Sequence, residues 1–305
     1  MLSVCIPIYN VLVYDLLCEL RTQIKEFDLA CEIICIDDNS NETTKLANIP
    51  AVAFCDQTIQ LKKNIGRSAI RNLFLEYAQY PYLLFLDCDV SIPDSNFLKN
   101  YLDSLQGKYK VICGGHRYTK QEPEKKYLLK WNYGRKRESK SLKERLKKPQ
   151  KSFMPSNFVI QKDIFAENPF DTRLSQYGHE DTLFAYHLSK AGIKFQHIAN
   201  AVEISDLELN ESYLNKTEQG IYNLKKILEY TDYDKQLIEN VSLLRFYFKS
   251  KRNGSLLLFS AFFALFDGWI RKKLLKGSTS LFLFDLFKLS RFAKVMRADT
   301  NQIIK

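Results

Sequence analysis

Short apolar runs rich in β-branched residues alternate with stretches of helical periodicity from the first residues of this chain onward. Alternation of this kind is typical of βαβ units, in which a crossover helix returns the chain to begin the next parallel strand. The sequence therefore predicts an α/β fold on a mostly parallel, Rossmann-like sheet. Strands are predicted at residues 2–8, 32–36, 52–54, 82–86, 111–113, 157–160 and 195–199, with a helix from about Glu180 to Ala191.

Positive charge is concentrated in two segments of the chain. Residues 241–305 contain 13 Lys and Arg against three acids, which accounts for the whole net charge of +10, and residues 108–151 contain 16 basic against four acidic side chains. Such blocks attract phosphate-rich or anionic partners, or form a solvated face. We expect one domain over residues 1–240, with a mobile basic arm at about 116–151, and a basic amphipathic helical tail over 241–305.

The predicted tail has two apolar stretches. Leu256–Ile270 is almost entirely apolar, but a helix of that length spans only about 22 Å, short of a bilayer core of roughly 30 Å. Leu281–Phe292 carries basic residues at helical spacing, which favours helices that lie in an anionic membrane surface. A buried helical hairpin that closes the domain is the alternative.

Cysteine usage and the start of the chain bear on its location. All seven cysteines precede residue 114, without a CxxC pair, and the chain opens into the apolar run Leu2–Ile8 without a basic leader. These features indicate reduced core cysteines and no signal peptide. We expect a cytoplasmic protein, peripheral on the inner face of the cell membrane.

Two pairs of carboxylates follow predicted strands. Asp37 and Asp38 come directly after Ile33–Ile36, and Asp87 and Asp89 follow another apolar strand. The i, i+2 spacing of the second pair places both acids on one face of the strand, where their repulsion favours a cation such as Mg²⁺ or Mn²⁺ held together with diphosphate oxygens. Each pair taken alone also fits turn or helix-capping residues.

Two helix starts carry further charged residues. Glu180 and Asp181 stand in the first turn of a predicted helix, where the helix dipole favours negative charge and capping explains one of them. Gly66 opens another helix, with Arg67 and Arg71 one turn apart, and this arrangement suits a nucleotide diphosphate or a base edge.

Taken in order, these segments resemble the inverting family 2 glycosyltransferases of the GT-A fold, in particular bacterial enzymes that build surface polysaccharides. The resemblance covers about residues 1–230. Its motifs are Ser3-Val-Cys-Ile-Pro-Ile-Tyr-Asn10, Ile36-Asp37-Asp38-Asn39-Ser40, Asn64-x-Gly66-x-x-x-x-Arg71-Asn72, Asp87-Cys88-Asp89 and His179-Glu180-Asp181.

The resemblance implies a nucleotide site. It assigns Pro7 and Tyr9 to the nucleotide base, Asp37 or Asp38 to the uracil and ribose, and Arg71 to the nucleotide.

The resemblance also implies the catalytic groups. Asp87 would contact the ribose or donor sugar, and Asp89 would bind the metal, Mn²⁺ or Mg²⁺. Asp181 would be the general base, with Glu180 orienting the acceptor or the donor sugar. A positioned carboxylate of this kind typically contributes ~10²–10⁴-fold to the rate.

One position departs from the family pattern. Relatives carry a metal-binding His where this chain has Ile204, and Ile cannot bind a metal. Asp206 or Glu203 would supply an oxygen ligand instead, or the site would hold metal only together with the nucleotide. A third alternative is that the enzyme has lost activity.

These implications predict a metal-dependent inverting glycosyltransferase of the hexosyl or N-acetylhexosaminyl type. It would move a sugar from a nucleotide sugar, a UDP-sugar in particular, to a glycan or lipid-linked glycan in surface polysaccharide synthesis. The alternatives are transfer to a lipid phosphate, or an inert membrane-bound partner of a polysaccharide assembly complex. Nucleic acid is not expected as a partner, because Trp131 and Tyr133 are too few for a stacking platform in the basic arm.

Overall fold

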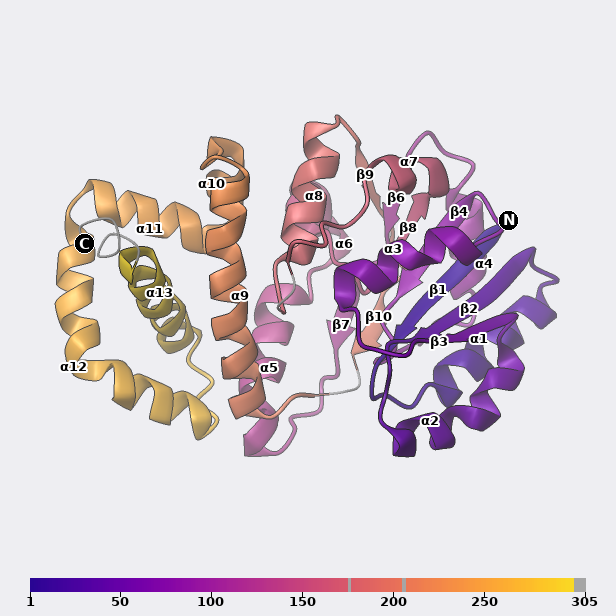
Figure 1. The fold of residues 1–305 in the computed structure, drawn as a ribbon, viewed down its shortest axis with the longest axis horizontal. Helices are drawn as coiled ribbons and strands as arrows, with labels where there is room; N and C mark the ends of the chain where they lie inside the picture. Colours follow the sequence, from indigo (N-terminus) through magenta and orange to yellow (C-terminus); the bar gives the residue numbers. More distant parts are fainter. Residues whose placement is uncertain (175–176, 205–206, 299–305) are drawn as a thin grey trace. The chain divides into compact units, whose positions relative to one another are not determined.

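The computed structural model describes residues 1–174, 177–204 and 207–298. A seven-stranded sheet runs in the order β3-β2-β1-β4-β8-β6-β9 (Figure 1). Among the described strands of this sheet, β8 alone runs antiparallel to its neighbours, so the prediction of a mostly parallel sheet is confirmed. The strands are β1 Leu2–Ile8, β2 Cys31–Asp37, β3 Gln57–Gln60, β4 Tyr82–Leu86, β6 Val111–Cys113, β8 Asn157–Gln161 and β9 Phe195–His197.

Helices cover both faces of this sheet (Figure 1). Side chains from α3, α7 and α8 pack on one face around the fully buried ring of Phe85. Because successive strand residues alternate between faces, Val4 and Ile6 point to the other face, where α1 and α4 lie. The helices are α1 Tyr14–Glu26, α2 Glu42–Asn48, α3 Arg67–Tyr77, α4 Phe97–Ser104, α7 Lys162–Glu167 and α8 Glu180–Lys190.

A second, three-stranded sheet runs in the order β5-β10-β7. It consists of β5 Val90–Ser91, β10 Val202–Ile204 and β7 His116–Tyr118. Ile204 in the central strand pairs with Val90 on one side and with Tyr118 on the other. This small sheet therefore begins directly after Asp89.

The prediction of a strand at residues 52–54 is wrong. Those residues belong to the 3₁₀ helix η1 Ile49–Phe54, and the strand β3 follows it at Gln57–Gln60. β3 is the edge strand of the large sheet and its residues alternate between partly buried and exposed. An edge strand needs fewer apolar side chains, so its polar sequence does not produce the pattern of a buried strand.

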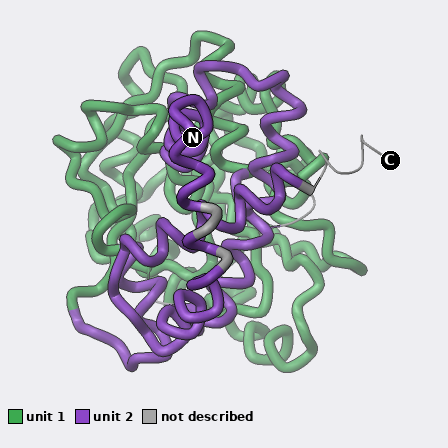
Figure 2. The backbone as a smooth tube through the Cα atoms, turned by 90° about the vertical axis from the view of Figure 1, so that its left-hand side faces the viewer, with its two compact units in different colours: residues 1–120, 135–175, 180–206 green, residues 121–134, 176–179, 207–305 purple. Residues whose placement is uncertain are grey.

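Two compact units make up the chain, shown in different colours in Figure 2. Unit 1 contains residues 1–120, 135–175 and 180–206, and unit 2 contains residues 121–134, 176–179 and 207–305. The main division thus falls at 206, not at the expected 240. Unit 2 holds α9 Asn210–Tyr230, α10 Lys235–Asn240, α11 Ser242–Arg252, α12 Ser255–Leu275 and α13 Leu281–Ala298.

The segment expected to be a mobile basic arm is folded instead. Its apolar side chains are concentrated on α5, where Leu129 and Trp131 are buried, and the Leu129 amide donates to Asn210 Oδ1 within unit 2. Farther along, the guanidinium of Arg145 is buried and donates to the carbonyls of Cys113 and Ile198 in unit 1. The segment contains η2 Lys125–Tyr127, α5 Leu128–Tyr133, the π-helix η3 Gly134–Glu138, α6 Leu142–Lys147 and η4 Gln150–Ser152.

The predicted tail is helical, and its inner side is part of the core of unit 2. α13 packs against α9 and α12, with Phe284, Phe287 and Phe292 buried. Asp267 of α12 accepts hydrogen bonds from Arg291 and Lys294 of α13. Along the described part of the chain, no helix combines the length and the apolar character that crossing a bilayer requires.

Candidate active site

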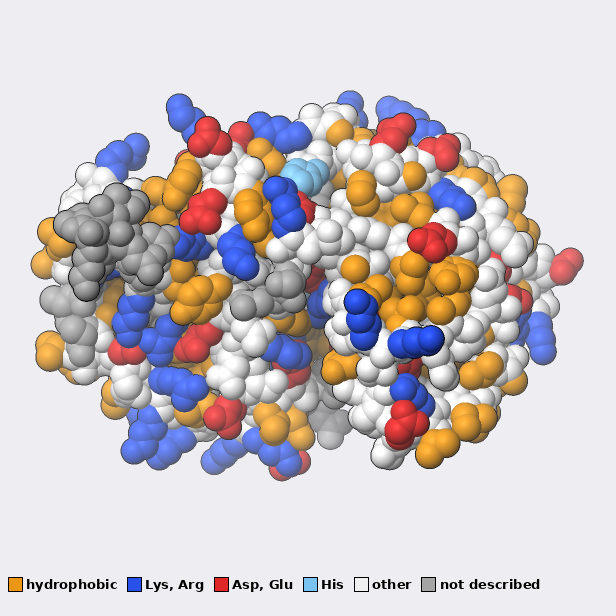
Figure 3. Space-filling view, viewed as in Figure 1, with side chains coloured by type: hydrophobic (Ala, Val, Ile, Leu, Met, Phe, Trp, Pro, Cys, Tyr) orange, Lys and Arg blue, Asp and Glu red, His pale blue; other side chains and the backbone are white. Residues whose placement is uncertain are grey.

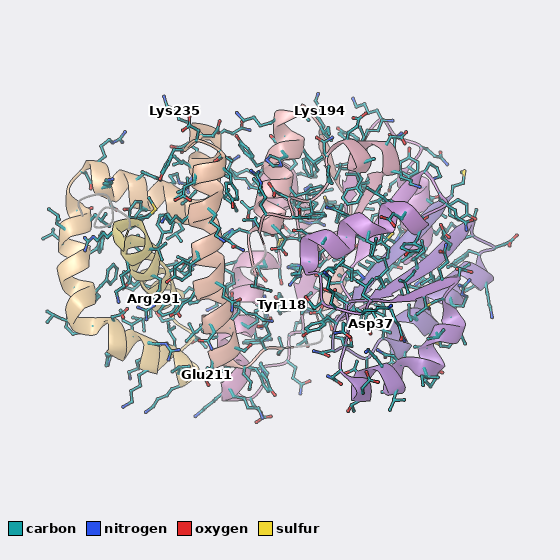
Figure 4. All side chains as sticks on the ribbon, viewed as in Figure 1. Asp37, Tyr118, Lys194, Glu211, Lys235 and Arg291 are labelled. Atoms are coloured by element: carbon teal, nitrogen blue, oxygen red, sulfur yellow. The ribbon has the colours of Figure 1, made fainter. Side chains whose placement is uncertain are left out.

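The carboxyl ends of β1 and β2 place the first group of predicted site residues side by side, since Ile8 is in register with Asp37. Asp37, labelled in Figure 4, accepts a hydrogen bond from the Ser40 amide at 2.6 Å and closes the turn after β2. Asp38 accepts hydrogen bonds from the amides of Ile65 and Gly66, at 2.7 and 3.1 Å. Burial nevertheless raises the pKa of Asp38 above its usual value. Asp38 therefore holds the loop that leads into α3.

The residues after β1 form the other side of this edge. Pro7 is half-buried within the strand, whereas the ring of Tyr9 is 51% exposed and free to meet a ligand. Asn10 has a φ of +55° and its amide donates to Ser40 Oγ at 2.8 Å, which ties this loop to the turn after β2. The loop that carries Tyr9 is thus fixed by the hydrogen bond between Asn10 and Ser40.

Asp87, the first acid of the Asp-x-Asp pair, is held by two arginines of α3. Arg71 lies 2.7 Å from Asp87 Oδ1, and Arg67 lies 3.6 Å from Oδ2. Burial opposes ionisation of Asp87, but the two guanidinium groups outweigh it and lower its pKa. Arg71 is only 2% exposed and packs on the ring of Phe170. The structure places Arg71 behind Asp87, so an effect on a nucleotide would pass through that carboxylate.

Arg67 connects the Asp-x-Asp pair to the start of α8. Its Nε lies 3.0 Å from Oε1 of Glu180, which is buried. The sequence predicts for Arg67 a contact with a nucleotide diphosphate or a base edge, and it does not predict this ion pair. Asp87, Arg67 and Glu180 therefore form one charged chain across unit 1.

Asp181, beside Glu180, has a different environment. Burial, together with the negative charge of Glu180, raises the pKa of Asp181 to about 6. Its Oδ1 accepts a hydrogen bond from the Thr182 amide at 2.7 Å. A carboxylate with a pKa near neutrality can accept a proton at physiological pH and release it again, as a general base must.

Asp89 lies at a cleft of about 610 Å³. The cleft is lined by the loop after β1, the first turns of α1 and the start of β5, including Asn10, Asp15, Glu19 and Ser91. Cys88 lines the same cleft and is half-buried, and burial together with the charge of Asp89 raises the pKa of its thiol to about 12. Of the two acids of the Asp-x-Asp pair, Asp89 is therefore the one that lines this cleft, and the thiol of Cys88 stays protonated.

The residues around Asp89 fit a divalent cation that is held by few protein ligands. Ile204 is 7% exposed and pairs with Val90, and Glu203 binds Arg117 at 3.2 Å. Asp206 lies outside the described residues. Within the described ranges, no group of three or more His, Cys, Asp or Glu side chains is placed to hold a metal. Mg²⁺ and similar hard ions, however, can bind through one or two carboxylates together with substrate phosphates. The Asp89 carboxylate at the cleft fits this mode of binding.

The structure also contains a polar cluster near Asp87 that the sequence does not predict. His116 is buried in β7, its Nδ1 lies 2.9 Å from Ser156 Oγ, and Glu138 lies on its other side. The one sequence signal is Gly114 before the strand, where an added Cβ would come within 2.3 Å of the Asn200 carbonyl oxygen.

Similarity to known proteins agrees with this geometry. Chondroitin synthase of Escherichia coli is 27% identical over 249 residues, which cover 66% of this chain and 34% of that protein. A teichoic acid poly(glycerol phosphate) polymerase of Staphylococcus epidermidis is 29% identical over 131 residues, which cover 40% of this chain and 17% of that protein. The chain therefore spans about a third or less of the length of these curated relatives.

Solved structures share the fold. A mannosyltransferase from Pyrobaculum calidifontis, in complex with GDP-Man and Mn²⁺, superposes with a TM-score of 0.57 at 12% identity, covering 96% of this chain and 87% of that one. S. aureus TarS 1–349 in complex with UDP gives a TM-score of 0.53 at 18% identity, covering 99% of this chain and 91% of that one. The expected GT-A fold is confirmed.

A family model described as Glycosyl transferase family 2 matches residues 3–168. This range contains β1, the Asp37-Asp38 and Asp-x-Asp segments and α3, in the order of the motifs identified above. Because the match extends over more than half of the chain, this protein belongs to glycosyl transferase family 2.

Proposed function

We propose that this protein transfers a hexosyl or N-acetylhexosaminyl group from a UDP-sugar to a hydroxyl of a glycan in surface polysaccharide synthesis, with inversion at the anomeric carbon. One observation carries the proposal: Asp181, whose pKa is about 6, neighbours Glu180, which Arg67 joins to Asp87 of the Asp-x-Asp pair. A base is thus held in the same unit as the acids that the family resemblance assigns to the donor.

The nucleotide would lie along the carboxyl ends of β1 and β2. The exposed ring of Tyr9 and the neighbouring Pro7 suit contact with a flat base, and Asp37 or Asp38 suits the uracil N–H and the ribose hydroxyls. Asp87 would contact the ribose or the donor sugar, positioned by Arg71.

The reaction itself is a single displacement. The acceptor oxygen attacks the anomeric carbon and its proton passes to the Asp181 carboxylate, while the bond from that carbon to the diphosphate oxygen breaks and UDP leaves. Attack from the face opposite the leaving group inverts the configuration. Glu180, fixed by Arg67, would orient the sugar or the acceptor beside the base.

Asp89 would hold Mn²⁺ or Mg²⁺, whereas both oxygens of Asp87 face the arginines of α3. When bound, such a cation offsets the charge that develops on the leaving diphosphate. The mannosyltransferase of similar fold contains GDP-Man and Mn²⁺, and the TarS structure contains UDP, which supports a nucleotide diphosphate here.

The test is a panel of UDP-glucose, UDP-galactose, their N-acetyl and uronic acid forms, and GDP-mannose, each with Mn²⁺, with detection of free nucleotide. Metal-dependent release of UDP from one donor supports the proposal. Release that requires a polyprenyl phosphate would favour the lipid-phosphate alternative. If no donor is turned over and UDP does not bind, the inert-partner alternative holds.

The outer side of α12 supports the further proposal that the protein binds an anionic membrane surface. Its exposed apolar side chains recur at helical spacing on one side of the helix and include Leu257, Leu258, Phe262, Leu265, Phe266 and Trp269. Lys272, Lys273 and Lys276 follow at its end. Figure 3 shows hydrophobic and basic side chains together along the left margin, where α12 lies. An apolar stripe flanked by lysines suits a helix lying in an anionic interface, and cytoplasmic location on the inner face of the membrane would follow.

A further inference from the structure

A network of polar side chains joins β7 to the π-helix η3 within unit 1. The Tyr118 hydroxyl donates to Glu138 Oε2 at 2.7 Å, and His116 Nε2 lies 3.9 Å from the same oxygen. The His116 ring meets the Tyr118 ring edge-on, with centroids 5.8 Å apart. Glu138 is therefore held by two neighbours that are themselves packed together. Figure 4 labels Tyr118 on β7.

This network adjoins the Asp-x-Asp segment through two independent connections. His116 Nδ1 lies 2.9 Å from Ser156 Oγ, and the Ser156 carbonyl accepts a hydrogen bond from the Asp87 amide at 3.2 Å. On the other side, β10 lies between β7 and β5, with Ile204 in register with both Tyr118 and Val90. Ser156 therefore links the network to the backbone of Asp87. The strand β10 separates it from β5, which begins directly after Asp89.

Exposure differs within the network in a way that suits ligand binding. The side chains of His116 and Tyr118 are almost fully buried, whereas the side chain of Glu138 is 18% exposed. Glu138 is also the last residue of a π-helix, a rare geometry that is frequent at functional sites. The buried members hold the carboxylate, and the carboxylate is the part that a ligand can reach.

The chemistry of the network selects the class of ligand. An ionised carboxylate only accepts hydrogen bonds, up to about four of them, so Glu138 can pair with hydroxyl groups in addition to the Tyr118 phenol. It repels a phosphate of the nucleotide. Beside a nucleotide-sugar site, hydroxyl donors belong to sugars.

We propose that Glu138 binds a hydroxyl group of a sugar in the active site, with Tyr118 and His116 as positioning residues. This inference rests on the proposed function, and it adds a sugar-recognition residue that lies outside the family motifs of this chain. The hydroxyl belongs either to the transferred sugar or to the acceptor glycan, and both sources share the same recognition chemistry.

The experiment compares Glu138→Gln, which keeps the shape of the side chain, with the control Glu122→Gln, an exposed residue of the same segment. Affinity for UDP with Mn²⁺ is measured by calorimetry, and affinity for and hydrolysis of the UDP-sugar panel are measured in parallel. Transfer is measured with nitrophenyl hexosides as acceptors. Because hydrogen bonds to charged groups are the stronger ones, the loss is expected to be about tenfold or more.

If Glu138 binds the transferred sugar, Glu138→Gln weakens UDP-sugar binding about tenfold and leaves UDP binding unchanged. If it binds the acceptor, UDP-sugar binding and hydrolysis stay at the control level while the acceptor KM rises about tenfold. Tyr118→Phe, which removes one hydroxyl, should raise the same KM by a smaller factor with kcat unchanged. The inference is overturned if UDP binds normally and Glu138→Gln matches the control in every measurement. Failure of the wild type to bind UDP would instead contradict the proposed function.

Discussion

At the scale of single residues, Glu180 and Asp181 show how two adjacent carboxylates acquire different properties. Glu180 is paired with Arg67 at 3.0 Å, whereas burial and the charge of Glu180 raise the pKa of Asp181 to about 6. A carboxyl group whose pKa is raised toward neutrality is typical of acid–base sites. Glu180 is therefore fixed by an ion pair, whereas Asp181 has a pKa that suits the proposed general base.

Asp181→Asn should keep UDP binding and lose turnover by a factor of about 100 or more, because an amide cannot take up the acceptor proton. Calorimetry with UDP and Mn²⁺ and release of free UDP from the donor measure the two effects. Turnover within a factor of about 10 of wild type would exclude Asp181 as a general base of ordinary strength.

The pH dependence of kcat/KM should have an acid limb near pH 6, with activity lost below it as Asp181 becomes protonated. Glu180→Gln removes a negative charge that raises the pKa of Asp181, so the acid limb should move to lower pH. This shift is independent of any change in the maximal kcat/KM. Glu26→Gln, the same change at an exposed position of α1, should leave the limb in place. If the acid limb does not move in Glu180→Gln, protonation of Asp181 is not the cause of the limb.

Arg71→Ala should destabilise the protein by about 3–5 kcal/mol, because it leaves the carboxylate of Asp87 mostly buried without its nearest cation. Arg67→Ala, on the same helix but 41% exposed, should cost much less. Urea unfolding of both variants compares them directly. Equal losses would show that Asp87 does not depend on Arg71.

At the scale of secondary-structure elements, the small sheet β5-β10-β7 brings distant segments to Asp89, the proposed metal ligand. Ile204 pairs with Val90, the residue after Asp89, so the strand on which the family resemblance leads us to expect a His lies beside the proposed metal ligand. The proposed metal site would therefore lack one ligand because residue 204 is Ile and not His.

Ile204→His should lower the Mn²⁺ concentration needed for half-maximal UDP binding, because an imidazole at this position adds a ligand that isoleucine cannot supply. Titration of UDP binding with Mn²⁺ measures the shift. Val202→His, two residues earlier on the same strand and in register with His116, serves as the matched control. An unchanged titration in Ile204→His would place the metal away from β10.

Replacing two exposed leucines of α12, in the double variant Leu258→Gln with Leu265→Gln, should abolish flotation with vesicles that contain phosphatidylglycerol. Leu46→Gln with Leu146→Gln, the same change at exposed leucines of unit 1, should float like the wild type. Vesicles of phosphatidylcholine alone should bind weakly, because the lysines then contribute little. If sedimentation shows that the α12 variant instead loses a dimer, this side of α12 binds a second copy.

At the scale of the whole molecule, the described part of the predicted tail, residues 241–298, packs as part of unit 2. α13 covers α9, and Phe284, Phe287 and Phe292 are buried in unit 2. Truncating one such ring to Ala typically costs about 3–5 kcal/mol.

Truncation after residue 240 should therefore leave α9 exposed and unit 2 without fixed structure. If the tail were a separate element, the same truncation would leave an intact domain. Limited proteolysis and hydrogen exchange along α9 measure this loss. Removal of 299–305 alone is the control. Protection of α9 in the longer truncation would show that the tail is dispensable for folding.

The sequence by itself determined the central strands and the order of the motifs. Leu2–Ile8 and Tyr82–Leu86 coincide with β1 and β4, because strands buried on both faces need continuous apolar runs. Acids that follow such strands must gather at the carboxyl edge of a parallel sheet, and this rule is enough to predict where Asp37 and Asp87 lie.

Only the tertiary structure decided which of these groups are paired and where the units divide. Arg67 meets Glu180, and Glu138 meets Tyr118, through contacts between residues far apart in the chain. Periodicity reports which side of an element is apolar, but not which element covers it, so the folded basic segment and the packing of α13 on α9 could not be predicted. The raised pKa of Asp181 has the same origin, since burial and a neighbouring charge are properties of the folded chain.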